Sequence, residues 1–300
     1  MNTESRREFI TQCAVGGAAF LQAGLPSVVC GAKKPASSKQ SGKVQYGLVT
    51  YNWGKDWDLP TLIKNCETAE VPGVELRTTH KHGVERTLTA AQRCDVKKQF
   101  ADSPVTLVGI GSNERYDNPD PKVVQAAIAA THDFIKLSHD VGGTGVKVKP
   151  DSFHKNVPHE KTIEQIGRTL NQLGKYGQEW GQQIRLEVHG QCAPLPIIKQ
   201  ILDIADHPNV AICWNCNPTD LQGEGLEYNF NLVKDRMGDT VHIHDLINSP
   251  YPHQQFFNLL AKANYSGWLM LEEGKVPKEN RVAKLAEQKK LFTKMWQQAQ

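Results

Sequence analysis

From residue 44 onward, short apolar runs alternate regularly with longer amphipathic stretches. Runs of this length, bounded by turn residues, are typical of buried strands, whereas apolar positions three and four apart indicate helices. The pattern predicts strands over 44–52, 73–79, 105–112, 145–150, 183–190, 210–217, 240–246 and 267–273. It predicts helices between them, for example over 121–141 and 159–180, and a last helix over about 279–298.

Eight repeats of strand followed by helix imply a parallel sheet covered by helices. Eight units are the number that closes a (β/α)8 TIM barrel, and 300 residues suit one such domain. An open doubly wound sheet is the alternative. It is disfavoured because the first strand runs into Tyr51-Asn52-Trp53-Gly54, with no glycine-rich phosphate-binding loop.

The first residues read differently from the rest of the chain. Arg6 and Arg7 form a twin-arginine pattern, a weakly apolar stretch follows, and small residues come after Cys30. This combination favours a twin-arginine (Tat) signal peptide over 1–32 rather than an ordinary amphipathic helix. The residue before Cys30 is Val29, which is not small, so a lipoprotein anchor is not expected.

The chain therefore divides into three parts. The signal over 1–32 is followed by a Lys-, Ser- and Pro-rich linker over 33–43 and by the barrel over 44–300. We expect the Tat translocase as an export partner and a periplasmic location. No apolar run is long and clean enough to predict a stable membrane span, and a net charge of +3 argues against a nucleic-acid partner.

Catalytic residues of such barrels lie at the carboxyl ends of the strands, and side chains two apart share a face. Polar side chains share a face on seven of the predicted strands: Thr50 and Asn52; Glu75 and Arg77; Lys147 and Lys149; Arg185, Glu187 and His189; Cys213, Asn215 and Asn217; His242 and His244; Met270 and Glu272. Any one of these residues alone is most simply explained as a solvated residue at the rim of the barrel. Glu75 and Arg77 are most simply explained as an ion pair inside it. So many charges on one inner face are costly unless they pair or bind an ion, so we expect a functional cluster.

Carboxylate, imidazole and amide ligands converge from the last strands of the predicted barrel. Glu187, His244 and Glu272, with an oxygen from Asn215, would form a four-ligand site for a divalent ion. Mixed oxygen and nitrogen ligands suit Mn, Co, Zn or Mg and do not choose among them. In the alternative interpretation the ion is weak or absent, and Lys147 or Lys149 supplies the positive charge.

Three segments carry a resemblance to a known family. They are LEVHG at 186–190, VHIHD at 241–245 and LMLE at 269–272. With them, residues 44–300 resemble the xylose-isomerase-like TIM-barrel superfamily of sugar phosphate isomerases and epimerases. The resemblance implies metal ligands from strands five to eight, which carry over to Glu187, Asn215, His244 and Glu272. The family usually has Asp at the sixth strand, so Asn215 is a departure that removes one negative charge.

By this resemblance the chain is an isomerase or epimerase, with Glu187 and Glu272 as catalytic groups that move a C–H proton through an enediolate. Export favours an unphosphorylated carbohydrate as the small-molecule substrate. Candidate substrate-binding residues are Asn52, Lys147, Lys149, His189, Asn217 and His242.

Three other functions remain open at this point. A lyase or hydratase acting on an oxidised sugar or a glycoside would use the same enolate chemistry. A non-catalytic carbohydrate-binding barrel would explain Asn215. A DNA-repair nuclease is least favoured, because export separates the protein from DNA. The sequence leaves self-association into a homo-oligomer open.

Overall fold

A computed structural model describes residues 43–300 of the chain. The predicted signal over 1–32 lies outside these residues, as does all of the predicted linker except its last residue, Lys43. In the described part, no helix is long and apolar enough to cross a membrane.

Eight parallel strands close into a barrel in chain order, and β1 pairs with β8. The strands are β1 (Gln45–Val49), β2 (Gly73–Arg77), β3 (Thr106–Arg115), β4 (Gly145–Lys149), β5 (Gln183–Glu187), β6 (Val210–Asn215), β7 (Met237–Ile243) and β8 (Trp268–Leu271). This confirms the predicted (β/α)8 TIM barrel.

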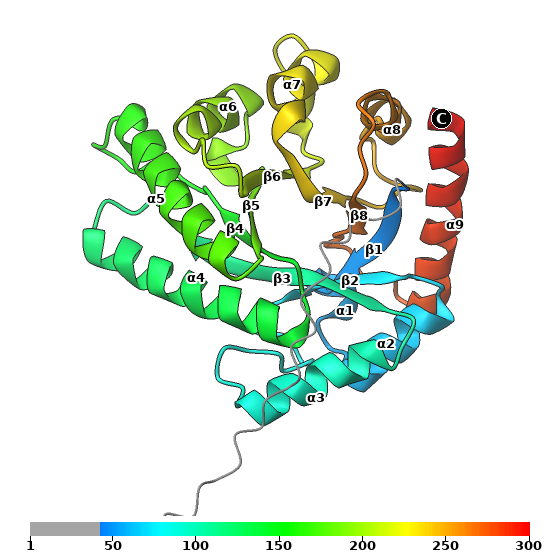
Figure 1. The fold of residues 1–300 in the computed structure, drawn as a ribbon. Helices are drawn as coiled ribbons and strands as arrows, with labels where there is room; N and C mark the ends of the chain where they lie inside the picture. The colour runs from blue at the N-terminus through cyan, green and yellow to red at the C-terminus, as the bar shows by residue number, and fades with distance from the viewer. Residues whose placement is uncertain (1–42) are drawn as a thin grey trace, which may run out of the picture.

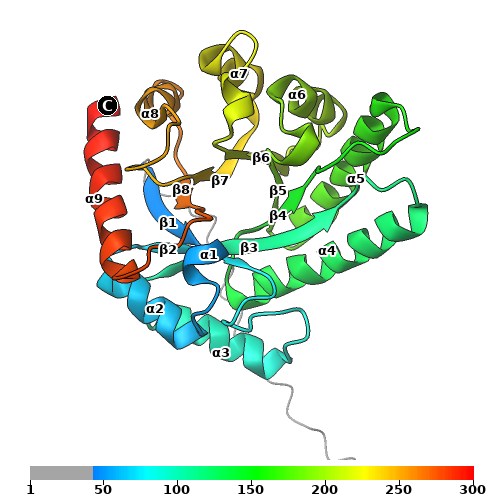
Figure 2. The ribbon, with the colours of Figure 1, turned by 180° about the vertical axis from the view of Figure 1, so that it is seen from behind.

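The helices are α1 (Tyr51–Gly54), α2 (Leu59–Thr68), α3 (Ala90–Ala101), α4 (Pro121–Val141), α5 (His159–Glu179), α6 (Leu195–Ile204), α7 (Leu226–Val233), α8 (His253–Lys262) and α9 (Arg281–Ala299). Helices α2 to α9 form a ring around the strands, seen from opposite sides in Figures 1 and 2, and the short α1 lies inside this ring, directly after β1. Short 3-10 turns lie at Gly190–Cys192, Pro218–Leu221 and Lys234–Arg236. The last helix, α9, packs between α8 and α2 and so closes the ring.

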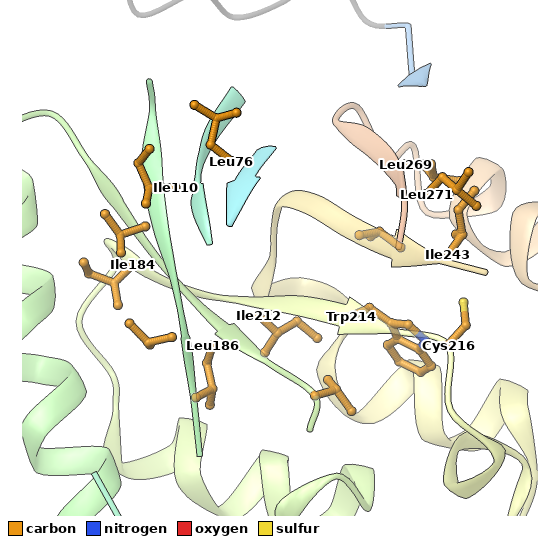
Figure 3. Close-up of a cluster of buried hydrophobic side chains, with 14 of the residues drawn as sticks. Leu76, Ile110, Ile184, Leu186, Ile212, Trp214, Cys216, Ile243, Leu269 and Leu271 are labelled. Carbon is orange, nitrogen blue, oxygen red and sulfur yellow. The ribbon is translucent and has the colours of Figure 1, made fainter. Parts of the chain in front are cut away.

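The main hydrophobic core lies between the strands and the helices (Figure 3). Alternate strand residues face this layer, among them Leu76, Leu186, Ile243 and Leu271. Trp214 belongs to it as well and stacks on Phe256 with ring centroids 5.1 Å apart. The period-two pattern therefore assigned these side chains to the correct face.

The intervening residues fill the interior of the barrel. At its amino-terminal end, Arg185 is fully buried and donates to Thr144 Oγ1 at 2.7 Å and to Asp239 Oδ2 at 3.1 Å. A Cβ at Gly109 would lie 2.9 Å from the Arg185 guanidinium, so the glycine makes room for it. Arg185 is thus a structural residue, remote from the carboxyl ends of the strands.

Most predicted strands are too long at their carboxyl ends, and the first, fifth and seventh each run three residues too far. The first was expected over 44–52 but ends at Val49, because the chain turns into α1 at Tyr51. The fifth was expected over 183–190 but ends at Glu187, and a 3-10 turn begins at Gly190. The first segment therefore continues as a short helix and the fifth as a loop, and both contribute to the mouth of the barrel.

Candidate functional site

Four polar side chains meet at the carboxyl-terminal end of the barrel. Glu187 ends β5, Asn215 ends β6, His242 lies on β7 and Glu272 follows β8. Register explains the meeting, because Asn215 pairs with His242 between β6 and β7, and the backbone N–H of Glu272 donates to the Ile243 carbonyl at 2.9 Å. We call these four residues the central cluster.

The terminal atoms of the central cluster surround one point. Asn215 Nδ2 donates to Glu187 Oε1 at 3.0 Å and to Glu272 Oε2 at 3.2 Å. His242 Nδ1 lies 3.1 Å from Glu272 Oε2 and 3.6 Å from Glu187 Oε1. All four side chains are buried. Among the described residues, Glu187, His242 and Glu272 form a group whose ligand atoms lie within 4.8 Å of one another, close enough to hold one metal ion.

A second set of charged groups binds the outer atoms of this cluster. Lys147 Nζ donates to Glu187 Oε2 at 2.6 Å, and Arg77 donates to Glu272 Oε1 at 3.3 Å. His242 Nε2 hydrogen-bonds Glu75 Oε1 at 3.1 Å. Glu187, Glu272 and His242 are therefore each oriented by a partner on the far side, as is common around metal ions in proteins.

The charges of this cluster support one another. Burial would raise the pKa of Glu187, but Lys147 and His242 outweigh it and hold that pKa well below the usual range. Burial would also raise the pKa of Glu272, but His242 outweighs it and lowers that pKa to about 2. Burial would lower the pKa of His242, but surrounding negative charge, including Glu272 and Glu75, raises it well above its ordinary value. Both carboxylates are therefore ionised at neutral pH, and a metal ion would displace the proton on His242 Nδ1.

The predicted ligand His244 lies beside the central cluster. Its Nδ1 hydrogen-bonds the backbone carbonyl of Glu272 at 2.9 Å, and the residue is half-buried. The imidazole that meets the carboxylates of Glu187 and Glu272 is that of His242, which we had expected to bind substrate. The structure thus brings together three of the four predicted ligands, with His242 in the remaining position.

Two predicted substrate-binding residues bind backbone atoms instead of facing the cluster. Asn217 donates to the carbonyls of Val188 at 2.9 Å and Asn215 at 2.8 Å, which ties the loops after β5 and β6 together. Asn52 donates to the carbonyl of Gly274 at 2.8 Å and so links the loops after β1 and β8. Both amides therefore hold loops at the mouth of the barrel in place.

Lys149 and His189 form a second polar group next to Glu187. Lys149 Nζ lies 3.3 Å from His189 Nε2 and 3.9 Å from Glu187 Oε2. His189 Nδ1 hydrogen-bonds Asp151 Oδ1 at 2.6 Å, and Asp151 also pairs with Arg115 at 3.0 Å. Burial and the neighbouring Lys147 lower the pKa of Lys149. Lys149 and His189 therefore offer polar atoms beside the cluster for substrate oxygens.

Three contacts of the site were not expected from the sequence. Arg77 was expected to pair with Glu75, but its long side chain reaches Glu272 and Asn113. Asp151 was not identified because it follows β4 at a positive φ of 70°, where strand parity no longer applies. Glu75 was expected only to pair with Arg77. Because Glu75 on β2 and His242 on β7 both face the interior of the barrel, their parity could have indicated the contact between them.

The donor set fits a divalent ion. Carboxylate and imidazole atoms converge, and His242 carries the carboxylate partner typical of metal-binding histidines. Asn215 Oδ1 is buried and has no hydrogen-bond partner among the described residues. Rotation of this amide by a half-turn exchanges its oxygen and nitrogen and would direct the oxygen at the carboxylates of Glu187 and Glu272. A cation between these oxygens would stabilise that orientation.

Comparison with solved structures gives the same architecture in proteins of low sequence identity. A 3-keto-D-glucoside 4-epimerase, YcjR, from E. coli has a TM-score of 0.71 at 12% identity, over 84% of this chain and 100% of that chain. A D-psicose 3-epimerase from Clostridium cellulolyticum H10 has a TM-score of 0.68 at 15% identity, over 85% and 99%. The IOLI protein, solved with a binding zinc atom, has a TM-score of 0.72 at 13% identity, over 86% and 99%.

Sequence comparison identifies the family. No curated protein matches the chain. The sequence profile described as "Xylose isomerase-like TIM barrel" matches residues 63–294, which covers most of the barrel and every residue of the central cluster. The chain therefore belongs to the xylose isomerase-like TIM barrel family.

Proposed function

We propose that the protein is a divalent-ion-dependent isomerase or epimerase of an unphosphorylated sugar or sugar derivative. The observation that carries this proposal is the convergence of Glu187, Asn215, His242 and Glu272 around one point at the mouth of the barrel. Epimerases among the solved structures with this fold give further support. The twin-arginine pattern favours an exported protein, and phosphorylated sugars are mainly cytoplasmic.

Glu187, Asn215, His242 and Glu272 would hold the ion. When bound, a divalent ion polarises a sugar carbonyl and makes the adjacent C–H bond more acidic. Mn, Co, Zn and Mg all remain compatible with these ligands.

The remaining steps belong to side chains of this chain. The ionised carboxylates of Glu187 and Glu272 are the candidates to accept the proton from carbon, which leaves an enediolate. Return of that proton to the former carbonyl carbon, with transfer of the hydroxyl proton between the two substrate oxygens, gives an isomer, and delivery of a proton to the opposite face of the same carbon gives an epimer. Lys149 and His189 would donate hydrogen bonds to substrate oxygens and so stabilise the negative charge.

An elimination reaction is the second candidate. Lys149 lies 3.9 Å from Glu187 Oε2, so a cationic donor stands next to a candidate base. With a leaving oxygen on the carbon beside the enolate, the pair would favour a lyase or hydratase acting on a keto sugar or glycoside.

The test is exchange of substrate hydrogen in D2O. Purified protein is loaded with Mn²⁺, Co²⁺, Zn²⁺ or Mg²⁺ and incubated with ketoses, inososes and 3-keto-glycosides, and products are followed by NMR. We expect deuterium at the carbon next to the carbonyl and a new isomer or epimer. Chelation should abolish the exchange, and Glu272→Gln should reduce it by about a thousandfold or more, because that variant removes both an ion ligand and a candidate base.

Glu273→Gln is the matched control. Glu273 is the neighbouring carboxylate, but it accepts from the backbone N–H groups of Asp245 and Lys275 rather than facing the cluster. It should keep exchange close to the wild-type rate. Absence of both exchange and any new product with every substrate and ion would contradict the proposal and leave a carbohydrate-binding barrel, and release of a leaving group would support the lyase instead.

A further inference from the structure

Lys147 is a buried cation in direct contact with a candidate ion ligand. Its side chain is 0% exposed, and Nζ lies 2.6 Å from Glu187 Oε2. An ammonium group in a dry interior is unfavourable unless an opposite charge compensates it. The Glu187 carboxylate is therefore neutralised in part before any ion arrives.

A glycine on the neighbouring strand makes room for charged side chains beside Lys147. On β3, Gly111 pairs with Lys147, and a Cβ at this glycine would lie 2.9 Å from Glu75 Oε1 and 3.1 Å from Arg77 Cγ, but at an ordinary contact distance of 3.5 Å from Lys147 Cε. The missing side chain therefore lets Glu75 and Arg77 enter the interior next to Lys147.

Basic groups in the upper barrel already compensate its buried carboxylates. Three carboxylates, those of Glu75, Glu187 and Glu272, are matched by three cations, and His242 contacts Glu75 and Glu272 as a further basic group. The cations are Arg77, Lys147 and Lys149. A divalent ion would enter a buried site without an excess of negative charge, and Lys147 is the cation that bonds the Glu187 carboxylate most closely.

We propose that Lys147 competes with the divalent ion for the charge of Glu187. The ammonium keeps Glu187 in position in the ion-free protein, leaves only Oε1, which faces the cluster, to bind an ion, and makes ion binding weaker and more readily reversible. The inference rests on the ion site of the proposed function, but it concerns ion affinity alone and is independent of the substrate.

The experiment compares Lys147→Met with Lys149→Met. Lys149→Met removes an equal charge whose Nζ is 3.9 Å from Glu187 Oε2 rather than 2.6 Å. Binding of Mn²⁺ is followed by the EPR signal of the free ion, and binding of Co²⁺ and Zn²⁺ by calorimetry, all without substrate. We expect Lys147→Met to bind at least one of these ions about tenfold more tightly or better than the wild type, and Lys149→Met to show a clearly smaller gain.

Thermal unfolding provides a second readout. In chelator, Lys147→Met should unfold at a lower temperature than the wild type, because Glu187 is left buried without its partner. Added ion should raise its unfolding temperature more than that of the wild type. The double variant Lys147→Met, Glu187→Gln removes both charges and should recover much of the stability in chelator.

Two results would overturn the proposal. One is unchanged or weaker ion binding by folded Lys147→Met, and the other is an equal gain in both single variants. If the wild type binds none of the three ions, the ion role in the proposed function fails. Binding gained only in Lys147→Met would still support the competition.

Discussion

Glu187 and Glu272 each direct one oxygen to the centre of the cluster and the other to a cation. Glu187 meets Lys147 on its far side, and Glu272 meets Arg77. Such pairs fix the rotamer of a carboxylate and keep it ionised despite burial. The geometry of the candidate site is therefore held by the barrel itself.

Asp220 gives a residue-scale prediction for pH. It is fully buried, and its Oδ2 accepts from Tyr251 Oη and from the Asn217 N–H, both at 2.9 Å. Burial raises its pKa from 3.8 to about 7. The folded state therefore holds this proton more tightly than the unfolded state, so Asp220 makes the free energy of unfolding fall as pH rises from about 4 to about 7.

The measurement is urea unfolding of the wild type and Asp220→Asn between pH 4 and pH 8. The decrease in unfolding free energy that occurs only in the wild type should amount to at most about 4 kcal/mol across this range. The variant, which has no proton to lose here, should lack that part of the pH dependence. Parallel curves for the two proteins would show that the Asp220 carboxyl does not titrate in this window.

At the scale of elements, the loops after β4 and β5 hold His189 in place. Asp151 adopts a φ of 70°, and its carbonyl accepts from the Cys192 N–H at 3.2 Å. Gly190 has a φ of 67°, and a Cβ there would lie 2.4 Å from the Asp151 carbonyl oxygen. The two loops are therefore packed backbone against backbone, which only glycine at this position permits.

Two glycine substitutions separate this contact from backbone strain. Gly190→Ala and Gly223→Ala both place a side chain at a positive φ, 67° and 64°, but nothing lies within 4 Å of a Cβ at Gly223. Gly223→Ala should cost about 1 kcal/mol in unfolding free energy, as expected for strain alone. Gly190→Ala should cost several kcal/mol and broaden the His189 NMR signals, and equal costs would contradict the packing described.

Sequence periodicity predicted the strands because it reports which face each side chain occupies. Glu75, Lys147, Glu187, Asn215 and Glu272 all lie on the expected inner face. Face does not determine depth, however. His242 and His244 share a face but differ by two residues, roughly 6.6 Å along a strand, and only the pairing of β6 with β7 brings His242 level with Asn215.

For the whole molecule, eight strand-helix units were enough to predict the closed barrel. Pairings across the interior were not predictable in the same way. Arg77 reaches from β2 to Glu272 after β8, and Glu75 reaches His242 on β7. Strand parity limits such partners to side chains on the inner face, but the reach of long side chains decides which of these groups pair.

The most direct test of the ion site is anomalous X-ray diffraction from crystals grown with Zn²⁺, measured on both sides of the zinc absorption edge. We predict one anomalous peak at the barrel mouth, about 2.0–2.2 Å from atoms of Glu187, Asn215, His242 and Glu272. A peak bound by His244 in place of His242 would contradict the ligand set described here. A mouth without a peak at saturating zinc would contradict the ion site itself.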